Sequence, residues 1–522
     1  MAEFFQEMLD ARYLGWLSGR LTGSAVSSGQ TVRLALDLAC RLVLIGLLGA
    51  CRDVPEDIPR NDVVPTKEQL EYEKMELLGF VHFGVNTFTD SEWGYGDESP
   101  DVFGPMALDP GQWASVAAEV GMKELILTAK HHDGFCLWPS RYTEHSVKSS
   151  AWRDGAGDVV RDFVSAARQR GVKVGLYLSP WDRNHADYGG PAYIEYYRSQ
   201  LRELLTGYGT ITEIWFDGAN GGDGYYGGAD EERRIDRESY YRWSETWALV
   251  KALQPGILIF SDAGPDIRWI GNERGFAGVT NWSMINTAGI VVGAADAAYL
   301  NTGDPLGTDW VVPLCNTSIR PGWFYHAAED SAAKTAQQLL EVYYRSVGRN
   351  CVLLLNVPPD RRGLFHENDV AVLREFRRIL DETFRVNLAL NKAVTADSHR
   401  ESASYFAPSN VVDDDADSYW AAEDGVRQAT LEVDLGKPTY FDRIMLQEPI
   451  RFGQRVAAFA IEAFLNGGWS RIAGGTTIGY KRLLRIGGVE TDRIRIIIEQ
   501  ANNVPALSNF GLFEASPAEA AP

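Results

Sequence analysis

Short apolar segments alternate with helical patterns from about residue 67 to residue 385, and this alternation leaves few folds open. The clearest helix lies between two such segments, where Val160, Phe163, Val164 and Ala167 follow the i, i+3, i+4, i+7 spacing and Gly171 marks the end. Strands alternating with helices predict a parallel sheet with crossover helices. The expected strands are 78–85, 124–128, 172–178, 211–216, 257–260 and 351–357, with further helices at 113–121, 239–253 and 332–347.

Polar and aromatic residues follow the ends of several different expected strands. Enzymes built on barrels place their functional groups in this way, at the carboxyl ends of many strands. A doubly wound sheet is the alternative, but it gathers functional residues near one switch point, and the sequence has no Gly-rich phosphate-binding fingerprint. We therefore predict a (β/α)8-like barrel. The strand-end residues are His82, His131, His132, Asp133, Tyr177, Ser179, Asp217, Ser261, Asp262 and Asn356.

The pattern changes again near residue 386. From there, short alternating strands are separated by Gly, Asp and Pro with no helical pattern between them, which predicts an all-β sandwich. After Cys51, an Asp- and Pro-rich stretch at 52–69 is typical of a tether. We expect an N-terminal extension at 1–66, a catalytic barrel at 67–385 and a β-sandwich at 386–522.

Cys51 lies at the end of a segment typical of a secretory signal. It follows Arg41, an apolar run at 42–48 and the small pair Gly49–Ala50. Residues 48–51 resemble the bacterial lipobox, in which the cysteine is lipidated, although a buried amphipathic helix is the alternative. The run is too short to span a bilayer alone. We expect an exported lipoprotein in the periplasm or on the surface of a bacterium. The segment lies unusually far from Met1, which a start codon downstream of Met1 would explain.

Charge and cysteine spacing exclude other classes of protein. The formal net charge is −21 and no basic patch is visible, so phosphate backbones would repel the chain and no nucleic-acid partner is expected. Contact with a membrane is expected only through the lipid anchor. The five cysteines are widely spaced and show no disulfide framework or zinc-finger spacing.

Two carboxylates are candidates for acid–base or nucleophilic chemistry. Asp217 follows an apolar strand, and alternation places Trp215 on the same side, as a glycosidase needs for a sugar wall and a nucleophile. Capping of the following turn is the alternative for Asp217. Glu273 lies in the segment 266–275, whose glycines predict a loop. An aromatic residue in the same segment would raise the pKa of the Glu273 carboxyl towards the range of a general acid. A surface salt bridge to Arg274 is the alternative for Glu273.

The adjacent histidines His131 and His132 follow a strand and precede Asp133. A metal site is one interpretation, but adjacent side chains diverge and no distant His/Asp set completes a zinc or iron site. Hydrogen bonding to ligand hydroxyls is the simpler role.

Four groups of residues together resemble the α-L-fucosidase family, glycoside hydrolase family 29. They occur in the family's order between about residues 75 and 384. They are His82-Phe83-Gly84 with 86–89 and 92–94, Ala129 to Phe135, Ile214 to Gly218, and Leu353 to Asp360.

The resemblance implies retaining hydrolysis, with Asp217 as the nucleophile. The string 268–273 resembles the branch that acts on α-1,3/1,4-linked fucose in branched glycans, and it implies Glu273 as the acid/base. No catalytic metal or other cofactor is implied, and the expected partners are fucosylated oligosaccharides. The implied hydroxyl partners are His82, Glu92, Trp93, His131 and His132, and the implied apolar wall for the C6 methyl group is Phe80, Tyr177, Trp215 and Trp323.

The C-terminal part resembles discoidin-type (coagulation factor 5/8 C-type) carbohydrate modules, through 387–392, 410–413 and 417–420. Asp413 and Asp415 offer oxygen ligands suited to a structural Ca²⁺. A solvated acidic turn is the alternative.

Three functions compete at this point. The first is an exported exo-α-L-fucosidase. The second is a non-catalytic glycan-binding lipoprotein, in which the sandwich acts and the barrel is a relic. The third is a barrel metallohydrolase that uses His131 and His132. The retained carboxylates and strand-end residues favour the first.

Overall fold

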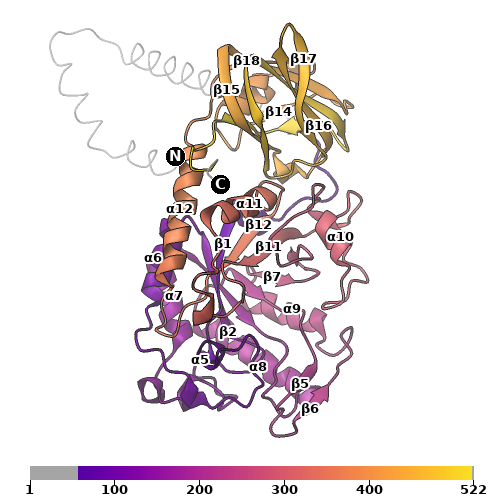
Figure 1. Cartoon of the computed structure of the whole chain (residues 1–522). Coiled ribbons are helices and arrows are strands. Elements are labelled where there is room, and N and C mark those ends of the chain that lie inside the picture. The colour runs from indigo at the N-terminus through magenta and orange to yellow at the C-terminus, as the bar shows by residue number, and fades with distance from the viewer. Residues whose placement is uncertain (1–56, 520–522) are drawn as a thin grey trace, which may run out of the picture. The chain divides into compact units, whose positions relative to one another are not determined.

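The computed structural model describes residues 57–519 (Figure 1). Cys51 and its apolar segment lie outside the described residues, so their lipidation stays a prediction. Within the described residues, no helix is long and apolar enough to cross a membrane.

Eight parallel strands form a closed barrel in the order β1-β12-β11-β8-β7-β4-β3-β2. Strands β1, β2, β7, β11 and β12 are labelled in Figure 1. The predicted (β/α)8-like architecture is therefore confirmed. The strands are β1 (Leu77–Val81), β2 (Glu124–Lys130), β3 (Lys173–Leu178), β4 (Glu213–Trp215), β7 (Leu258–Ser261), β8 (Ile267–Trp269), β11 (Val312–Ser318) and β12 (Val352–Asn356).

Two barrel strands, β8 and β11, were not expected. The segment 266–275 was predicted to be a loop, but its first part is β8. The strand was missed because it contains a charged residue, Arg268. This side chain is fully buried and donates hydrogen bonds to the carbonyl oxygens of Leu300, Ser283 and Trp282. A charged residue in a three-residue strand hides the apolar pattern. Strand β11 contains Pro313 and ends in polar residues, which also conceals it.

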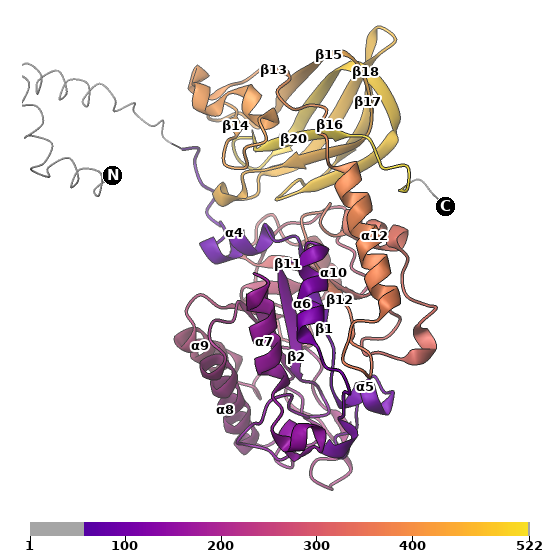
Figure 2. The ribbon, with the colours of Figure 1, turned by 90° about the vertical axis from the view of Figure 1, so that its left-hand side faces the viewer.

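Amphipathic helices cover the outside of the barrel. In α7 (Val159–Gln169) the Asp158 side chain caps the first turn by accepting from the Arg161 N–H, and the predicted apolar residues are buried. Helix α6 packs against β2, and α7 packs against β2 and β3; both helices lie on the outside of the barrel (Figure 2). The other long helices are α6 (Pro110–Glu119), α8 (Pro191–Gly207), α9 (Trp243–Leu253), α11 (Ala336–Arg345) and α12 (Glu367–Thr383).

Short elements occupy the connections of the barrel. They are α4 (Lys67–Glu73), α5 (Val85–Thr89), α10 (Ala297–Thr302), the hairpin β5 (Gly222–Gly224) and β6 (Glu231–Arg233), and the pair β9 (Met284–Ile285) and β10 (Asp309–Trp310). The expected strand 78–85 is shorter in the structure, because β1 ends at Val81 and α5 begins at Val85.

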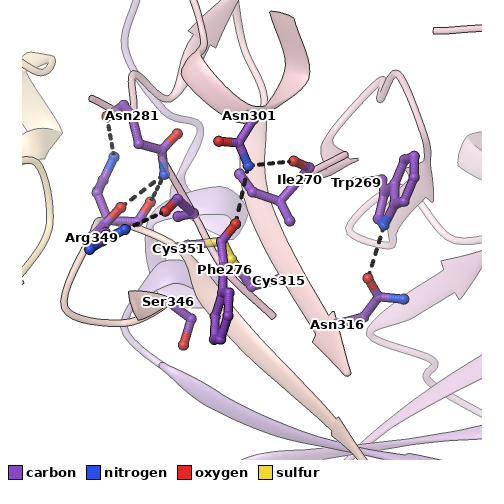
Figure 3. The surroundings of a disulfide bond; sticks show 12 residues. Trp269, Ile270, Phe276, Asn281, Asn301, Cys315, Asn316, Ser346, Arg349 and Cys351 are labelled. Carbon is purple, nitrogen blue, oxygen red and sulfur yellow. Dashed lines mark hydrogen bonds between the residues drawn. A yellow bond between two sulfur atoms is a disulfide. The ribbon is translucent and has the colours of Figure 1, made fainter. Parts of the chain in front are cut away.

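A disulfide bond joins Cys315 in β11 to Cys351, the residue before β12 (Figure 3). Spacing in the sequence gave no sign of this pair, because the two cysteines meet only when β11 and β12 pair in register. Cys136 is buried and unpaired.

The C-terminal domain is antiparallel and built around its own apolar core. Alternation is visible in β15, where Leu431 and Val433 are buried and Asp434 is exposed. Its main sheet has the order β13-β15-β18-β16-β17, with β20 also pairing with β15. The strands are β13 (Ala393–Ala396), β15 (Ala429–Gln447), β16 (Val456–Leu465), β17 (Gly468–Gly475), β18 (Arg482–Ala501) and β20 (Asn509–Phe513), with a second sheet of β14 (Trp420–Ala421) and β19 (Ala506–Leu507).

The sandwich contacts residues at the amino-terminal end of β12. The Tyr480 N–H donates to Asn350 Oδ1 at 2.7 Å, and the Asn350 N–H donates to the Lys481 carbonyl oxygen at 3.0 Å. Asn350 lies just before β12, whereas Asn356 is the last residue of that strand. These contacts are therefore at the opposite end of β12 from the polar strand-end residues.

Candidate active site

Asp217 and Glu273 line one cavity of about 270 Å³ at the carboxyl ends of the barrel strands. Asp217 follows β4, and Glu273 lies in the loop after β8. The structure therefore brings together two carboxylates that are separated by 56 positions in the chain. The other lining residues are Trp215, Gly218, Ala219, Phe260, Asp262, Trp269, Gly293 and Asn316.

Asp217 is held by two hydrogen bonds. Its Oδ1 accepts from the Ala219 N–H at 2.6 Å, and its Oδ2 accepts from the Tyr177 hydroxyl at 3.3 Å. Burial raises the pKa of Asp217 to about 6, and the hydrogen bond from Ala219 opposes this rise. The nearby Asp262 and Glu273 carboxylates raise the same pKa further. The pKa of Asp217 therefore lies well above that of an ordinary aspartate.

Glu273 is exposed at the edge of the cavity. Its pKa is raised, first by partial burial and then by the Glu92 carboxylate, while a side-chain hydrogen bond with Trp323 opposes the rise. A raised pKa keeps a larger fraction of this carboxyl protonated, which is what a general acid needs. Trp269, the aromatic neighbour seen in the sequence, lines the same cavity.

Asp262 is a third carboxylate in this cavity, and the sequence analysis gave it no role. Its side chain is buried, and Oδ2 accepts from the Gly293 N–H at 2.6 Å while Oδ1 has no hydrogen-bond partner. Burial raises its pKa. The sequence places Asp262 just after the expected strand 257–260, but nothing in its spacing distinguishes it from the other strand-end residues.

Three buried histidines from two strand ends form another side of the site. Burial lowers the pKa of His82 to about 4 and of His132 to about 3, and the pKa of His131 also lies well below its ordinary value. These rings are neutral near pH 7, so each can donate one hydrogen bond and accept another. Asn356 Oδ1 lies 2.9 Å from His82 Nδ1, and Ser179 Oγ lies 2.7 Å from His132 Nδ1, which fixes both rings.

Of the four predicted wall aromatics, three gather around the fourth, Phe80. Its ring centroid lies 5.0 Å from Trp215, 6.0 Å from Tyr177 and 6.3 Å from Trp323. Trp215 also stacks on Phe260, which the sequence analysis did not single out. Because Tyr177 packs with Phe80 inside the barrel, its side chain faces the interior and its hydroxyl reaches Asp217.

Glu92 and Trp93 lie in the loop after α5. Glu92 accepts hydrogen bonds from the Trp323 N–H at 2.8 Å and the Phe324 N–H at 3.1 Å, and His326 Nε2 lies 2.8 Å from its Oε1. Glu92 therefore holds the segment that carries Trp323. The contact of His326 with Glu92 was not expected from the sequence. Trp93 is 53% exposed and lies edge-on to His132.

Comparison with known proteins decides the family. The α-L-fucosidase family model matches residues 60–382. The chain belongs to the α-L-fucosidase family. It is 46% identical over 456 residues to alpha-L-fucosidase 1 of Arabidopsis thaliana, a match that covers 86% of this chain and 87% of the plant protein. The F5/8 type C domain model matches residues 393–510, as the resemblance to discoidin-type modules predicted.

Solved structures give the same result. A glycoside hydrolase 29 family member from an unknown rumen bacterium is 43% identical, with a TM-score of 0.79 and coverage of 88% of this chain and 78% of that one. A GH29 fucosidase of Ruminococcus gnavus, solved in complex with fucose, is 33% identical, with a TM-score of 0.79 and coverage of 89% and 97%. The chain is therefore a glycoside hydrolase of the α-L-fucosidase type.

The sequence suggested a metal ion at two places, His131–His132 and Asp413–Asp415. Within residues 57–519, no group of three or more His, Cys, Asp or Glu side chains is placed to hold a metal ion. Asp413 Oδ1 accepts from the Asp415 N–H at 2.9 Å and from the Ser418 hydroxyl at 2.9 Å, as in a capped acidic turn. The calcium site stays a prediction from the sequence.

Proposed function

We propose that this fucosidase is a retaining exo-enzyme that removes terminal α-1,3/1,4-linked L-fucose from branched glycans. The observation that carries the proposal is the shared cavity of Asp217 and Glu273, beside an apolar corner and three neutral histidines. L-Fucose is a 6-deoxy sugar, so its binding site needs both an apolar surface and several hydroxyl partners. The fucose bound to the related R. gnavus enzyme is consistent with this ligand.

Asp217 is the proposed nucleophile. Its carboxylate attacks C1 of fucose while the bond from C1 to the glycosidic oxygen breaks, and Glu273 gives its proton to that oxygen. In the second step Glu273 takes a proton from water, the water oxygen bonds to C1, and the bond to Asp217 breaks. Fucose is released with its original anomeric configuration, and both carboxyls return to their starting protonation states.

The two carboxyls need different protonation states at the start of the reaction. Asp217 must be ionised, and the hydrogen bonds from Ala219 and Tyr177 stabilise its charged form. Glu273 must be protonated, and partial burial together with the Glu92 carboxylate favours that form. Their different environments therefore support one nucleophile and one acid.

The sugar is proposed to lie between the histidines and the aromatic wall. His82, His131 and His132 would bond hydroxyl groups, with Trp93 at the exposed edge of the site. Phe80, Tyr177, Trp215 and Trp323 would surround the C6 methyl group. Glu92 contacts Trp323 and Phe324 in the structure, so we propose that it acts on the sugar partly through that segment.

Export is proposed as well. The Cys315–Cys351 bond supports it, because disulfides persist in oxidising compartments and are rare in the cytosol. A lipid on Cys51 would then attach the exported chain to a membrane, outside the cytosol in which the chain is made.

Replacing the proposed nucleophile tests the mechanism by stereochemistry. Asp217→Ala should lower the turnover of fucosylated oligosaccharides by about 10³-fold or more. With α-L-fucosyl fluoride and azide, this variant should form β-L-fucosyl azide, because azide attacks C1 directly from the vacated side. Glu273→Ala should form the α-azide through the covalent intermediate. Asp262→Asn serves as a comparison, and loss of all activity there with near-normal Asp217→Ala turnover would contradict the assignment.

The hydrogen bond from Tyr177 predicts a change in pH dependence. Activity should fall as the pH drops through about 6, because Asp217 must lose its proton to attack. The Tyr177 hydroxyl lowers this pKa, so Tyr177→Phe should move the acid limb of kcat/KM to higher pH. The matched control is Tyr197→Phe, whose hydroxyl donates to the Leu178 carbonyl oxygen instead. Equal acid limbs in wild type and Tyr177→Phe would refute the proposed contact.

A linkage panel tests the proposed substrate class. Released fucose is measured with α-1,2, α-1,3, α-1,4 and α-1,6 fucosides of matched size. We expect kcat/KM for the α-1,3 and α-1,4 linkages in branched trisaccharides to exceed the others by at least about tenfold, a difference that one or two leaving-group contacts can supply. Comparable rates on all four linkages would leave the fucosidase assignment intact and reject the narrower specificity.

Cell fractionation tests export. When the full chain is expressed in a bacterium, it should be found in the membrane fraction with a mature N-terminus at a lipid-modified Cys51, as mass spectrometry of the N-terminal peptide would show. Cys51→Ser should release it from that fraction, whereas Cys136→Ser, a change at the buried unpaired cysteine, should not. An unprocessed chain in the cytosol would contradict the proposal.

A further inference from the structure

Both ends of the loop that carries Glu273 pack against the Cys315–Cys351 disulfide. Ile270 and Ala277, which flank the loop, are buried in one small apolar cluster with Cys315 and Cys351. Their exposed fractions are 0% and 3%, whereas Glu273 and Arg274 between them are exposed. Figure 3 shows Ile270 and Phe276 close to the sulfur–sulfur bond. The position of Glu273 therefore depends on a segment whose two buried ends rest on the disulfide.

Hydrogen bonds hold the same two ends. Asn301 Nδ2 donates to the carbonyl oxygens of Ile270 at 2.9 Å and Phe276 at 3.1 Å, which ties the two ends to each other (Figure 3). The Ala277 N–H donates to the Arg345 carbonyl oxygen at 2.8 Å. Asn272 bonds within the loop, where its Oδ1 accepts from the Arg274 and Phe276 N–H groups. The loop is thus a compact unit whose placement on the barrel is set by what lies under its ends.

The disulfide also fixes a neighbour of the cavity. Cys315 faces outward from β11, and the next residue, Asn316, faces the cavity. Asn316 Oδ1 accepts from Trp269 Nε1 at 3.0 Å, and both residues line the cavity with Glu273 (Figure 3). The bond between Cys315 and Cys351 covalently links β11, the strand that carries Asn316, to the residue just before β12.

Asp217 is supported differently. It follows β4, which is separated from β8 by β7 in the barrel, and its hydrogen bonds come from Ala219 and Tyr177. Neither residue belongs to the disulfide cluster. A change at the disulfide should therefore affect the two carboxyls unequally.

We propose that the Cys315–Cys351 disulfide is a positioning element for Glu273, which holds this carboxyl at the glycosidic oxygen of the substrate. The inference rests on the acid/base role proposed for Glu273. Its physical basis is preorganisation: a proton donor displaced by about 1 Å loses much of its effect on the rate, although the protein stays folded.

The test separates proton donation from the rest of catalysis through the leaving group. A fucosylated trisaccharide needs a proton on its departing oxygen, whereas α-L-fucosyl fluoride with added azide needs neither the acid nor the base. The double variant Cys315→Ala/Cys351→Ala should lose about 10- to 100-fold in kcat on the trisaccharide. Its turnover of fucosyl fluoride with azide should change little, and the basic limb of its pH profile should move.

Three further samples make the outcome interpretable. Glu273→Gln should show the same dependence on the leaving group in a stronger form. Cys136→Ser removes a buried cysteine outside the disulfide and should leave both rates unchanged. If the double variant does not fold, wild-type enzyme reduced with dithiothreitol replaces it, with circular dichroism to confirm the fold and reoxidation to restore activity on the trisaccharide.

The results distinguish this inference from the proposed function. If Glu273→Gln lowers the turnover of the trisaccharide and of fucosyl fluoride by the same factor, the acid/base assignment is wrong. If Glu273→Gln behaves as expected but loss of the disulfide lowers both rates equally, or neither, then the disulfide is only a structural bond and the positioning role is overturned.

Discussion

The packing of aromatic rings inside the barrel sets the chemistry of the ionisable groups at its mouth. Phe80, Tyr177 and Trp215 fill the interior just below the strand ends, and they exclude water from one side of the site. Burial is the largest cause of the raised pKa of Asp217 and of the lowered pKa of His82. A charge held away from water is disfavoured, so one apolar layer moves an acid and a base in opposite directions.

Hydrogen bonds orient the ionisable groups whose pKa values are shifted by burial. Asn356 fixes the ring of His82, Ser179 fixes that of His132, and the Tyr177 hydroxyl reaches Asp217. Tyr177 and Ser179 come from the end of β3 and Asn356 from the end of β12, so each contact joins neighbouring strands. The contact between Asn356 and His82 forms because β12 pairs with β1 and closes the barrel. Burial keeps the histidines neutral, so each ring can both donate and accept a hydrogen bond, and burial also raises the pKa of Asp217 and of Glu273.

Prediction from the sequence succeeded where a local pattern reports local structure. Six barrel strands were visible as apolar runs, and strand alternation correctly placed Trp215 and Asp217 on one side. It failed for β8, where Arg268 is buried because carbonyl oxygens far along the chain accept its hydrogen bonds. Asp262 was seen at a strand end but not as part of the cavity, because its distance from Asp217 depends on which strands are neighbours. The Cys315–Cys351 pair was invisible for the same reason.

By itself, the sequence determined the barrel, the following sandwich, the family and the residues at the strand ends, because each of these is encoded in short motifs or in periodicity. Only the tertiary structure decided that Asp217, Asp262 and Glu273 share a cavity, that Tyr177 faces inward, and that the Glu273 loop rests on a disulfide. These are relations between residues far apart in the chain. They exist once the eight strands have closed in a particular order and register, and no spacing in the sequence reports that order.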